Sequence, residues 1–188
     1  MKASTALAAL KVQPWASHAG YARSQFSDGW GNIGSCDTRN FILQRDLSSV
    51  TWRSGASCEV ATGVLNDPYT GKVIHFVRGV QTSLAVQIDH VVPLSNAWMT
   101  GAQLISAAGR NSLYNDPLNL LAVDGPTNEA KSDSDASAWL PPRAAFRCSY
   151  VARQIAVKRK YHLWVTGTEK AAMQGVLAGC PAQLLPTR

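Results

Sequence analysis

The sequence predicts a single α+β domain stabilised by disulfides. The chain has 188 residues, of which 46% are hydrophobic and 16% are charged, and this balance suits a globular protein with one core. Runs rich in β-branched residues occur in the first two thirds of the chain, whereas the last quarter repeats apolar residues at helical spacing. No window reaches the roughly 20 apolar residues that a membrane helix needs, so we expect no membrane insertion.

One domain is expected over residues 30–182, because neither an internal repeat nor a low-complexity linker divides the chain. We expect residues 1–29 to be a lead-in segment that packs on this domain, and residues 183–188 to be a C-terminal tail. The first ten residues are too short and too soon interrupted by polar residues to form a signal peptide. We therefore expect Met1 to stand after a removed signal peptide and residues 6–10 to form a short helix.

Turn residues separate the elements of the first half. Those between 27 and 34 precede a short helix expected over 38–47, which carries apolar side chains at 41, 42 and 47. Runs rich in β-branched residues over 58–64 and 72–80 flank the turn sequence NDPYTG at 66–71. This arrangement predicts a β-hairpin.

Apolar runs define the elements of the second half. Residues 86–92 are predicted as a strand, after which Pro93 can open a helix over 94–100. The run 118–123 is predicted as a strand that ends at turn residues 124–126, followed by a short helix up to Lys131. Beyond two prolines at 141 and 142, apolar residues at helical spacing predict a long helix, and a final helix over 169–177 ends at Gly179.

The four cysteines are far apart and form no C-x-x-C pair, which favours disulfides over a zinc site. Four cysteines allow three pairings, and loop-closure entropy favours Cys36 with Cys58 and Cys148 with Cys180. Disulfides indicate an oxidising compartment, so we expect a secreted, extracellular protein. Four buried free thiols in a cytosolic enzyme are the alternative.

Positive charge is concentrated at the end of the chain. The net charge is +6, and residues 141–188 hold eight Lys/Arg against one acid. A polyanion such as nucleic acid is the usual partner of such a segment, although an anionic membrane surface or simple solubility also explains it.

The sequence QIDHVVPLS at 87–95 sets Asp89 beside His90 in an apolar strand. Adjacent strand residues point to opposite faces. We therefore expect these two side chains to share a site only where the chain bends, bulges or ends, as it can just before Pro93. A structural acid–imidazole pair is the alternative.

A second group of polar residues lies downstream: Asn119 within DPLNLL at 116–121, then Asn128, then Lys131. In this order and spacing the chain resembles the HNH endonucleases, in particular a secreted family related to the C-terminal domain of GmrSD-type restriction enzymes. The segments CDTRN at 36–40, WLPP at 139–142 and FRC at 146–148 are also similar to that group. The resemblance covers about residues 30–180 and implies a ββα-metal core (HNH, or His-Me finger) with a β-hairpin and surrounding helices.

The resemblance implies a role for each of these residues. His90, with an ordinary pKa of about 6.5, would be the general base that deprotonates water. Asp89 and the amide oxygen of Asn128 would be metal ligands, and oxygen donors suit Mg²⁺ or Mn²⁺. Asparagine replaces the last histidine of the family name, which favours these ions further without excluding other divalent metals.

Asn119 and Lys131 complete the expected catalytic set. Asn119 would fix the finger by hydrogen bonds between its strands and so hold His90 in its productive tautomer; an ordinary turn-capping role is the alternative. Lys131 would neutralise the phosphate or support the metal shell, unless it is a solvent-exposed helix lysine.

These inferences predict a low-specificity endonuclease that hydrolyses DNA, with RNA also open, to 5′-phosphate and 3′-hydroxyl ends. We expect a monomer whose basic residues contact backbone phosphates without reading bases. The expected contacts are Arg39, Arg143, Arg147, Arg153 and Lys158. One alternative is a non-catalytic nucleic-acid-binding module with a structural metal finger, and another is a secreted protein that binds acidic polymers.

Overall fold

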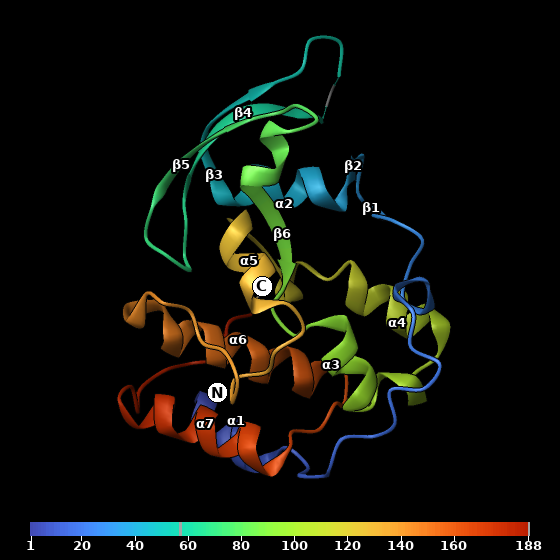
Figure 1. Cartoon of the computed structure of the whole chain (residues 1–188), viewed down its shortest axis with the longest axis vertical. Coiled ribbons are helices and arrows are strands. Elements are labelled where there is room, and N and C mark those ends of the chain that lie inside the picture. Colours follow the sequence, from blue (N-terminus) through green and yellow to red (C-terminus); the bar gives the residue numbers. More distant parts are fainter. Residues whose placement is uncertain (57, 188) are drawn as a thin grey trace.

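The chain folds into a mixed α+β structure, described by a computed structural model for residues 1–56 and 58–187. Within this described part the strands form small antiparallel sheets. The β3-β4-β5 sheet lies at one end of the molecule, next to α2, and the other helices lie around β6 and at the opposite end (Figure 1). The strands are β1 (Asn32–Ile33), β2 (Cys36–Asp37), β3 (Leu47–Trp52), β4 (Val60–Asn66), β5 (Val73–Val77), β6 (Val86–His90) and β7 (Leu120–Asp124). They pair as β1-β2, β3-β4-β5 and β6-β7.

The helices bear out most of the expected elements with small shifts at their ends. The α-helices are α1 (Ala3–Ala9), α2 (Thr38–Asp46), α3 (Leu94–Met99), α4 (Ala107–Tyr114), α5 (Gly125–Lys131), α6 (Arg147–Lys160) and α7 (Gly167–Ala178). Short 3-10 turns are η1 (Arg23–Gln25), η2 (Thr82–Ala85), η3 (Ala102–Leu104), η4 (Pro117–Asn119) and η5 (Ala144–Phe146). The sequence analysis did not predict α4 or β3.

The β6-β7 ribbon lies at the centre of the molecule, between the three-stranded sheet and α6 (Figure 1). Leu120 and Ala122 of β7 pack with α2 and the β3-β4-β5 sheet, whereas Leu121 and Val123 pack with α1, α6 and α7. Both faces of β7 are therefore buried, which is why its sequence is continuously apolar rather than alternating. A third cluster joins α3, α4 and α6.

α5 follows β7 without a connecting loop. The Asp124 carboxylate caps the helix by accepting from the Thr127 backbone N–H at 3.0 Å, and a proline in the first turn favours helical backbone. β6, β7 and α5 are therefore neighbours in space. β6 and β7 come from separate parts of the chain, whereas α5 directly follows β7.

β6 ends two residues before the predicted boundary. Asp89 pairs with Leu121 and His90 with Leu120, in a ladder without a register shift. Beyond His90, the backbone N–H of Val92 donates to the side chain of Asn119 at 2.8 Å. This bond stands where a backbone bond to β7 would continue the ladder.

The N-terminal segment belongs to the core through α1. Ala3, Ala6 and Leu7 are buried against α6 and α7. The backbone N–H of Ala3 donates to the carbonyl of Gln183 at 2.9 Å, which joins the two ends of the chain.

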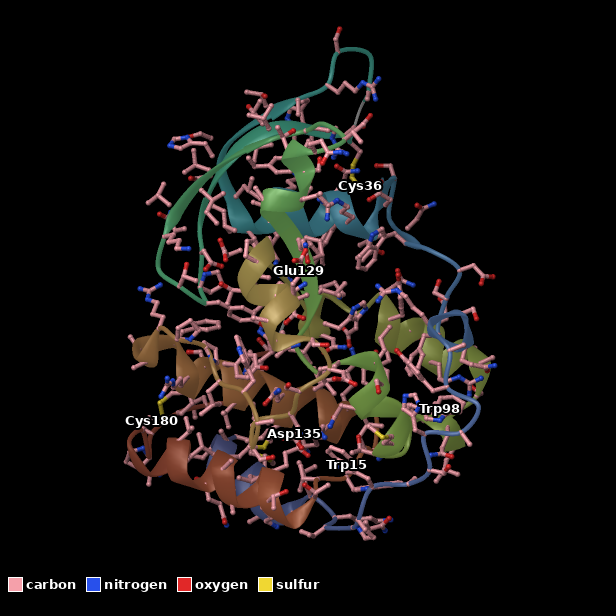
Figure 2. All side chains as sticks on the ribbon, viewed as in Figure 1. Trp15, Cys36, Trp98, Glu129, Asp135 and Cys180 are labelled. Carbon is pink, nitrogen blue, oxygen red and sulfur yellow. A yellow bond between two sulfur atoms is a disulfide. The ribbon has the colours of Figure 1, made fainter. Side chains whose placement is uncertain are left out.

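Both predicted disulfides are confirmed. Cys36 bonds to Cys58 and Cys148 to Cys180. Figure 2 shows Cys36 near the three-stranded sheet and Cys180 near α6 and α7, so the two bridges cross-link different ends of the molecule.

Among residues 1–56 and 58–187, none of the helices has the length and apolar character needed to cross a membrane.

Candidate active site

A cavity of about 380 Å³ lies beside β6 and α5. Its lining consists of Tyr21, Arg23, Gln87, Ile88, Asp89, His90, Pro93, Leu94, Ser95, Asn128, Glu129, Ser132 and Asp133. Four consecutive residues of β6 contribute, so the cavity follows the strand rather than one of its faces. For this reason Asp89 and His90 line one site although no bulge interrupts the ladder.

Asp89 is almost buried, with 5% of its surface exposed, and each carboxylate oxygen has a donor. Lys131 donates from Nζ to Oδ1 at 2.8 Å, and the Tyr69 hydroxyl donates to Oδ2 through a short hydrogen bond. Burial and the negative charge of Asp89 raise the pKa of Tyr69 well above 10, so the phenol keeps its proton. The carboxylate is held from both sides.

Lys131 supports Asp89 rather than facing the cavity. Its side chain is 0% exposed, and Nζ also donates to the His90 carbonyl at 3.0 Å. Of the expected roles for Lys131, a direct contact with substrate phosphate and a solvent-exposed lysine both disagree with this burial. The other expected role, support of the metal shell, is compatible with this burial, because Lys131 contacts the carboxylate of the proposed ligand Asp89.

His90 is fixed by its partners in one tautomer. Nε2 lies 2.9 Å from the Tyr114 carbonyl, which only accepts, so Nε2 carries the proton and Nδ1 is left as the acceptor. Trp30 stacks on the ring with centroids 5.7 Å apart and planes 10° apart. Burial, reinforced by the positive charges of Arg23 and Lys131 and opposed by the Tyr114 carbonyl, lowers the pKa of His90 to about 3. The imidazole is therefore neutral at neutral pH, but its pKa in this fold lies below the ordinary value of about 6.5 on which the expected role of general base rests.

Asn119 joins the segments after β6 and before β7. Its Oδ1 accepts from Val92 N at 2.8 Å, its Nδ2 donates to Val92 O at 3.3 Å, and its carbonyl accepts from Val91 N at 2.8 Å. These bonds join the segments just beyond the two strands, whereas the expectation places them between the strands. The expectation that Asn119 fixes the His90 tautomer is wrong, because Tyr114 does so.

Asn128 lies on α5 and is oriented by two further residues. Its Nδ2 donates to Gln87 Oε1 at 2.8 Å, and Gln87 Nε2 donates to Glu129 Oε1 at 2.9 Å. The carboxylate can only accept, so Gln87 must present its oxygen to Asn128. The amide oxygen of Asn128 is then left without a protein partner in the described part of the chain. Figure 2 shows Glu129 next to β6.

The donors at this cavity fit a hard divalent cation. Asp89 and Asn128 offer oxygens, and each Asp89 oxygen keeps a lone pair beyond the bond it already accepts. The described residues contain no group of three His, Cys, Asp or Glu able to hold a metal by themselves. An ion here would take most of its ligands from water and phosphate, which is typical of Mg²⁺ and unlike a structural zinc site.

Lys158 does not contact nucleic acid in this fold, and that prediction is wrong. Its side chain is 0% exposed, and Nζ lies 2.9 Å from Glu169 Oε1. Burial lowers the pKa of Lys158, while Glu169 opposes this change. The ammonium also donates to Asn96 Oδ1 at 3.0 Å and to the Trp164 carbonyl at 3.1 Å, so it joins α6 to α3 and α7.

The four arginines predicted to contact phosphate lie outside the cavity lining. Arg39 is half-buried and donates to Val86 O at 3.1 Å, Arg147 to Pro141 O at 2.8 Å and Arg153 to Leu118 O at 2.9 Å. Arg143 is exposed beside the turn at Gly71. None of them shares a wall with Asp89 and His90.

Sequence reasoning missed the residues that orient the site. Tyr69, Tyr114, Trp30 and Arg23 belong to turns, a weak helix or the lead-in segment, whereas Gln87 lies on β6. Gln87 had a signal, because it lies two residues before Asp89 and so on the same side of the strand. The other four had none in a single sequence, since their approach depends on tertiary packing.

Comparison with known proteins places the chain in a family. A family profile described as the C-terminal domain of GmrSD restriction endonucleases matches residues 37–176, which include the five predicted catalytic and metal residues. The chain is also similar to an uncharacterized secreted protein of Arthroderma benhamiae, with 37% identity over 180 residues that cover 95% of this chain and 84% of that protein. This match and the two disulfides agree with the predicted secretion. The chain belongs to the family of the GmrSD restriction endonuclease C-terminal domain, which suggests a nuclease-related function.

Proposed function

We propose that this protein is a divalent-metal-dependent endonuclease of low sequence specificity that hydrolyses phosphodiester bonds of DNA. One observation carries the proposal: Asp89, His90 and Asn128 line the same cavity in a chain whose family suggests a nuclease-related function. β6 presents Asp89 and His90, and α5 presents Asn128. Together with β7, which pairs with β6, these elements would form the ββα-metal finger.

His90 is the proposed general base. Its neutral ring offers Nδ1 to the proton of an attacking water while the Tyr114 carbonyl holds Nε2–H. As the water oxygen bonds to phosphorus, the 3′-oxygen leaves with its electron pair and takes a proton from a solvent water, which gives 5′-phosphate and 3′-hydroxyl ends. Bound Mg²⁺ or Mn²⁺ would neutralise phosphate charge and acidify the water.

Asp89 and Asn128 are the proposed metal-holding residues. Lys131 and Tyr69 keep the Asp89 carboxylate in one orientation, and Gln87 does the same for the Asn128 amide. All proposed contacts involve the phosphate or its water, which are the same for every base. Low specificity follows from this.

A plasmid nicking assay tests the proposal. Supercoiled DNA is incubated with the protein and Mg²⁺, Mn²⁺, Ca²⁺, Ni²⁺ or Zn²⁺, with an EDTA lane, and single-stranded DNA and RNA are run in parallel. His90→Ala should lower the rate by about 10²- to 10⁴-fold, the usual worth of a general base. His75→Ala is the matched control, because His75 is exposed on β5. Nicks with 3′-hydroxyl ends should be extended directly by a DNA polymerase.

A non-catalytic nucleic-acid-binding module is the second candidate. The observation that favours it is the close pairing of Asp89 with Lys131 and Tyr69, which is also how a purely structural acid is satisfied. DNA left intact with every metal, together with measurable DNA binding, would replace the endonuclease proposal with this one.

A further inference from the structure

Arg23 lies at the cavity although it precedes residues 37–176, the part matched by the family profile. Among the described residues that line the cavity, it is the only lysine or arginine. The acids that share the lining are Asp89, Glu129 and Asp133. Among the charged side chains of the lining, Arg23 alone is opposite in sign to a phosphate diester.

Tyr114 holds Arg23 and His90 at the same time. The Arg23 guanidinium lies over the Tyr114 ring, with Cζ 5.1 Å from its centroid, and Nη2 donates to the Tyr114 hydroxyl at 3.2 Å. The backbone carbonyl of the same tyrosine bonds His90 Nε2 at 2.9 Å. Tyr114 therefore sets the position of the Arg23 guanidinium relative to the His90 imidazole.

The segment that carries Arg23 is attached firmly to α4. Arg110 Nε donates to the Gln25 carbonyl at 2.7 Å, and Asn111 Nδ2 donates to Ser27 Oγ at 3.1 Å. Phe26 is 2% exposed and packs in the cluster with α3 and α4. Arg23 is thus presented from an anchored segment rather than from a free terminus.

We propose that Arg23 binds a non-bridging oxygen of the substrate phosphate held at this cavity, so that the lead-in segment completes the site. The proposal rests on the endonuclease function proposed above. Within the described contacts the guanidinium uses one of its five N–H groups on Tyr114, which leaves donors for a forked bond to phosphate. No other positive group lines the cavity in the described chain.

Cleavage by the wild type and by four variants tests this inference. Arg23→Ala should lower kcat/KM by about 10- to 100-fold, the range for a charge-assisted hydrogen bond. Arg23→Met keeps the side-chain stem on Tyr114 and loses the charge, so it should match Arg23→Ala. Arg23→Lys should recover part of the rate, because it restores the charge without the fork. Arg53→Ala, at an exposed arginine in the β3-β4 hairpin, should equal the wild type.

Two further measurements separate phosphate binding from packing. Added guanidinium ion should restore part of the activity of Arg23→Ala and none to Arg53→Ala. In the His90→Ala background, binding of a labelled duplex in EDTA should lose about one unit of its logarithmic salt slope when Arg23 is also replaced.

The outcomes are distinct. A wild-type protein that leaves DNA intact defeats the proposed function, whatever Arg23 does. An active wild type with Arg23→Ala within twofold of Arg53→Ala overturns the inference alone. Full activity of Arg23→Met also overturns it, because the role would then be packing on Tyr114.

Discussion

Two polar side chains of the cavity, those of His90 and Asn128, are oriented by neighbouring groups that accept hydrogen bonds and cannot donate them. The Tyr114 carbonyl can only accept, so it decides which nitrogen of His90 carries the proton. The Glu129 carboxylate can only accept as well, so the Gln87 amide turns its NH₂ group towards Glu129 and its oxygen towards Asn128. The NH₂ group of Asn128 donates to that oxygen, which fixes the orientation of the Asn128 amide. Orientation is therefore set by residues next to the proposed reacting groups rather than by those groups themselves.

Removing the carboxylate of Glu129 should release this orientation. Glu129→Gln offers an amide that can donate or accept, so Gln87 is no longer forced to turn its oxygen towards Asn128. We expect the Mg²⁺ concentration for half-maximal cleavage to rise about 10-fold or more, the usual effect of losing an outer partner of a metal ligand. Gln87→Ala should act in the same direction.

Glu59→Gln, on a glutamate that pairs with exposed Arg53, is the control and should leave the metal requirement unchanged. A Glu129→Gln protein with the metal requirement of the wild type would show that Asn128 does not depend on this pair of contacts.

The site could be predicted from the sequence only where its residues share a motif. Asp89, His90 and Asn128 are predicted from their order and spacing, and all three line the cavity. Tyr69 could not be found, since its turn sequence is that of an exposed hairpin, yet its ring is buried against Tyr150 and Trp139. Its bond to Asp89 is a product of tertiary packing, which no local pattern records.

The central ribbon has a protected outer edge. On β7, Arg45 Nη2 donates to Leu120 O at 2.7 Å, Asp46 Oδ2 accepts from Ala122 N at 2.8 Å, and Asp67 Oδ1 accepts from Asp124 N at 2.9 Å. Charged side chains thus satisfy backbone groups that would otherwise recruit another strand. A two-stranded sheet persists at the centre because these side chains and two core clusters cover it.

Elements with strong end signals were predicted well, and weak ones were not. α2 begins at a Thr38 capped by Asp37, and α7 carries a complete capping box between Thr166 and Glu169. By contrast, α4 buries only its last two residues, so it shows little apolar period. β3 is mostly exposed and follows α2 without a turn, which removes both the alternation and the boundary that a strand prediction needs.

The buried pair between α6 and α7 should be needed for stability rather than for nucleic-acid binding. Lys158→Met leaves Glu169 buried without its partner and should lower the free energy of unfolding by about 3–5 kcal/mol. Lys158→Met/Glu169→Gln removes the unpaired buried carboxylate. The glutamine can still accept from the Thr166 backbone N–H in the capping box, so the double variant should recover part of that loss. Urea unfolding of the wild type, Lys158→Met, Glu169→Gln and the double variant measures the coupling.

Additive effects of the two substitutions would show that the pair is not coupled. The salt dependence of DNA binding should be the same for Lys158→Met and the wild type, measured under conditions in which both are folded. A reduced slope would restore Lys158 as a phosphate contact.

Charge in the sequence and charge on the surface differ in this molecule. The last 48 residues hold eight of the 18 basic residues, which favours a polyanion as the partner of this segment. In the fold, Lys158 is buried, Arg153 is half-buried, and Lys160 pairs with Asp116 at 2.7 Å. A count of basic residues along the chain cannot tell which of them are buried in the core or paired with acids.

The two disulfides divide the covalent support of the molecule between its ends. Cys36–Cys58 closes a sequence separation of 22 residues near the three-stranded sheet, and Cys148–Cys180 closes 32 residues around α6 and α7. Loops of this size correspond to about 3–4 kcal/mol each in the chain-entropy account. The bridges lie outside the cavity lining, so they should affect stability far more than chemistry.

Replacing both cysteines of one bridge by alanine should therefore lower Tm by about 6–15 °C, given about 2–4 °C per kcal/mol for a chain of this size. Cleavage at 25 °C should stay within about threefold of the wild type for Cys148→Ala/Cys180→Ala, whose bridge is attached to the helices behind β7. Calorimetry and the nicking assay on the same preparation measure both quantities. A variant with unchanged Tm and lost cleavage would reverse the assignment, because the bridge would then hold the site and not the fold.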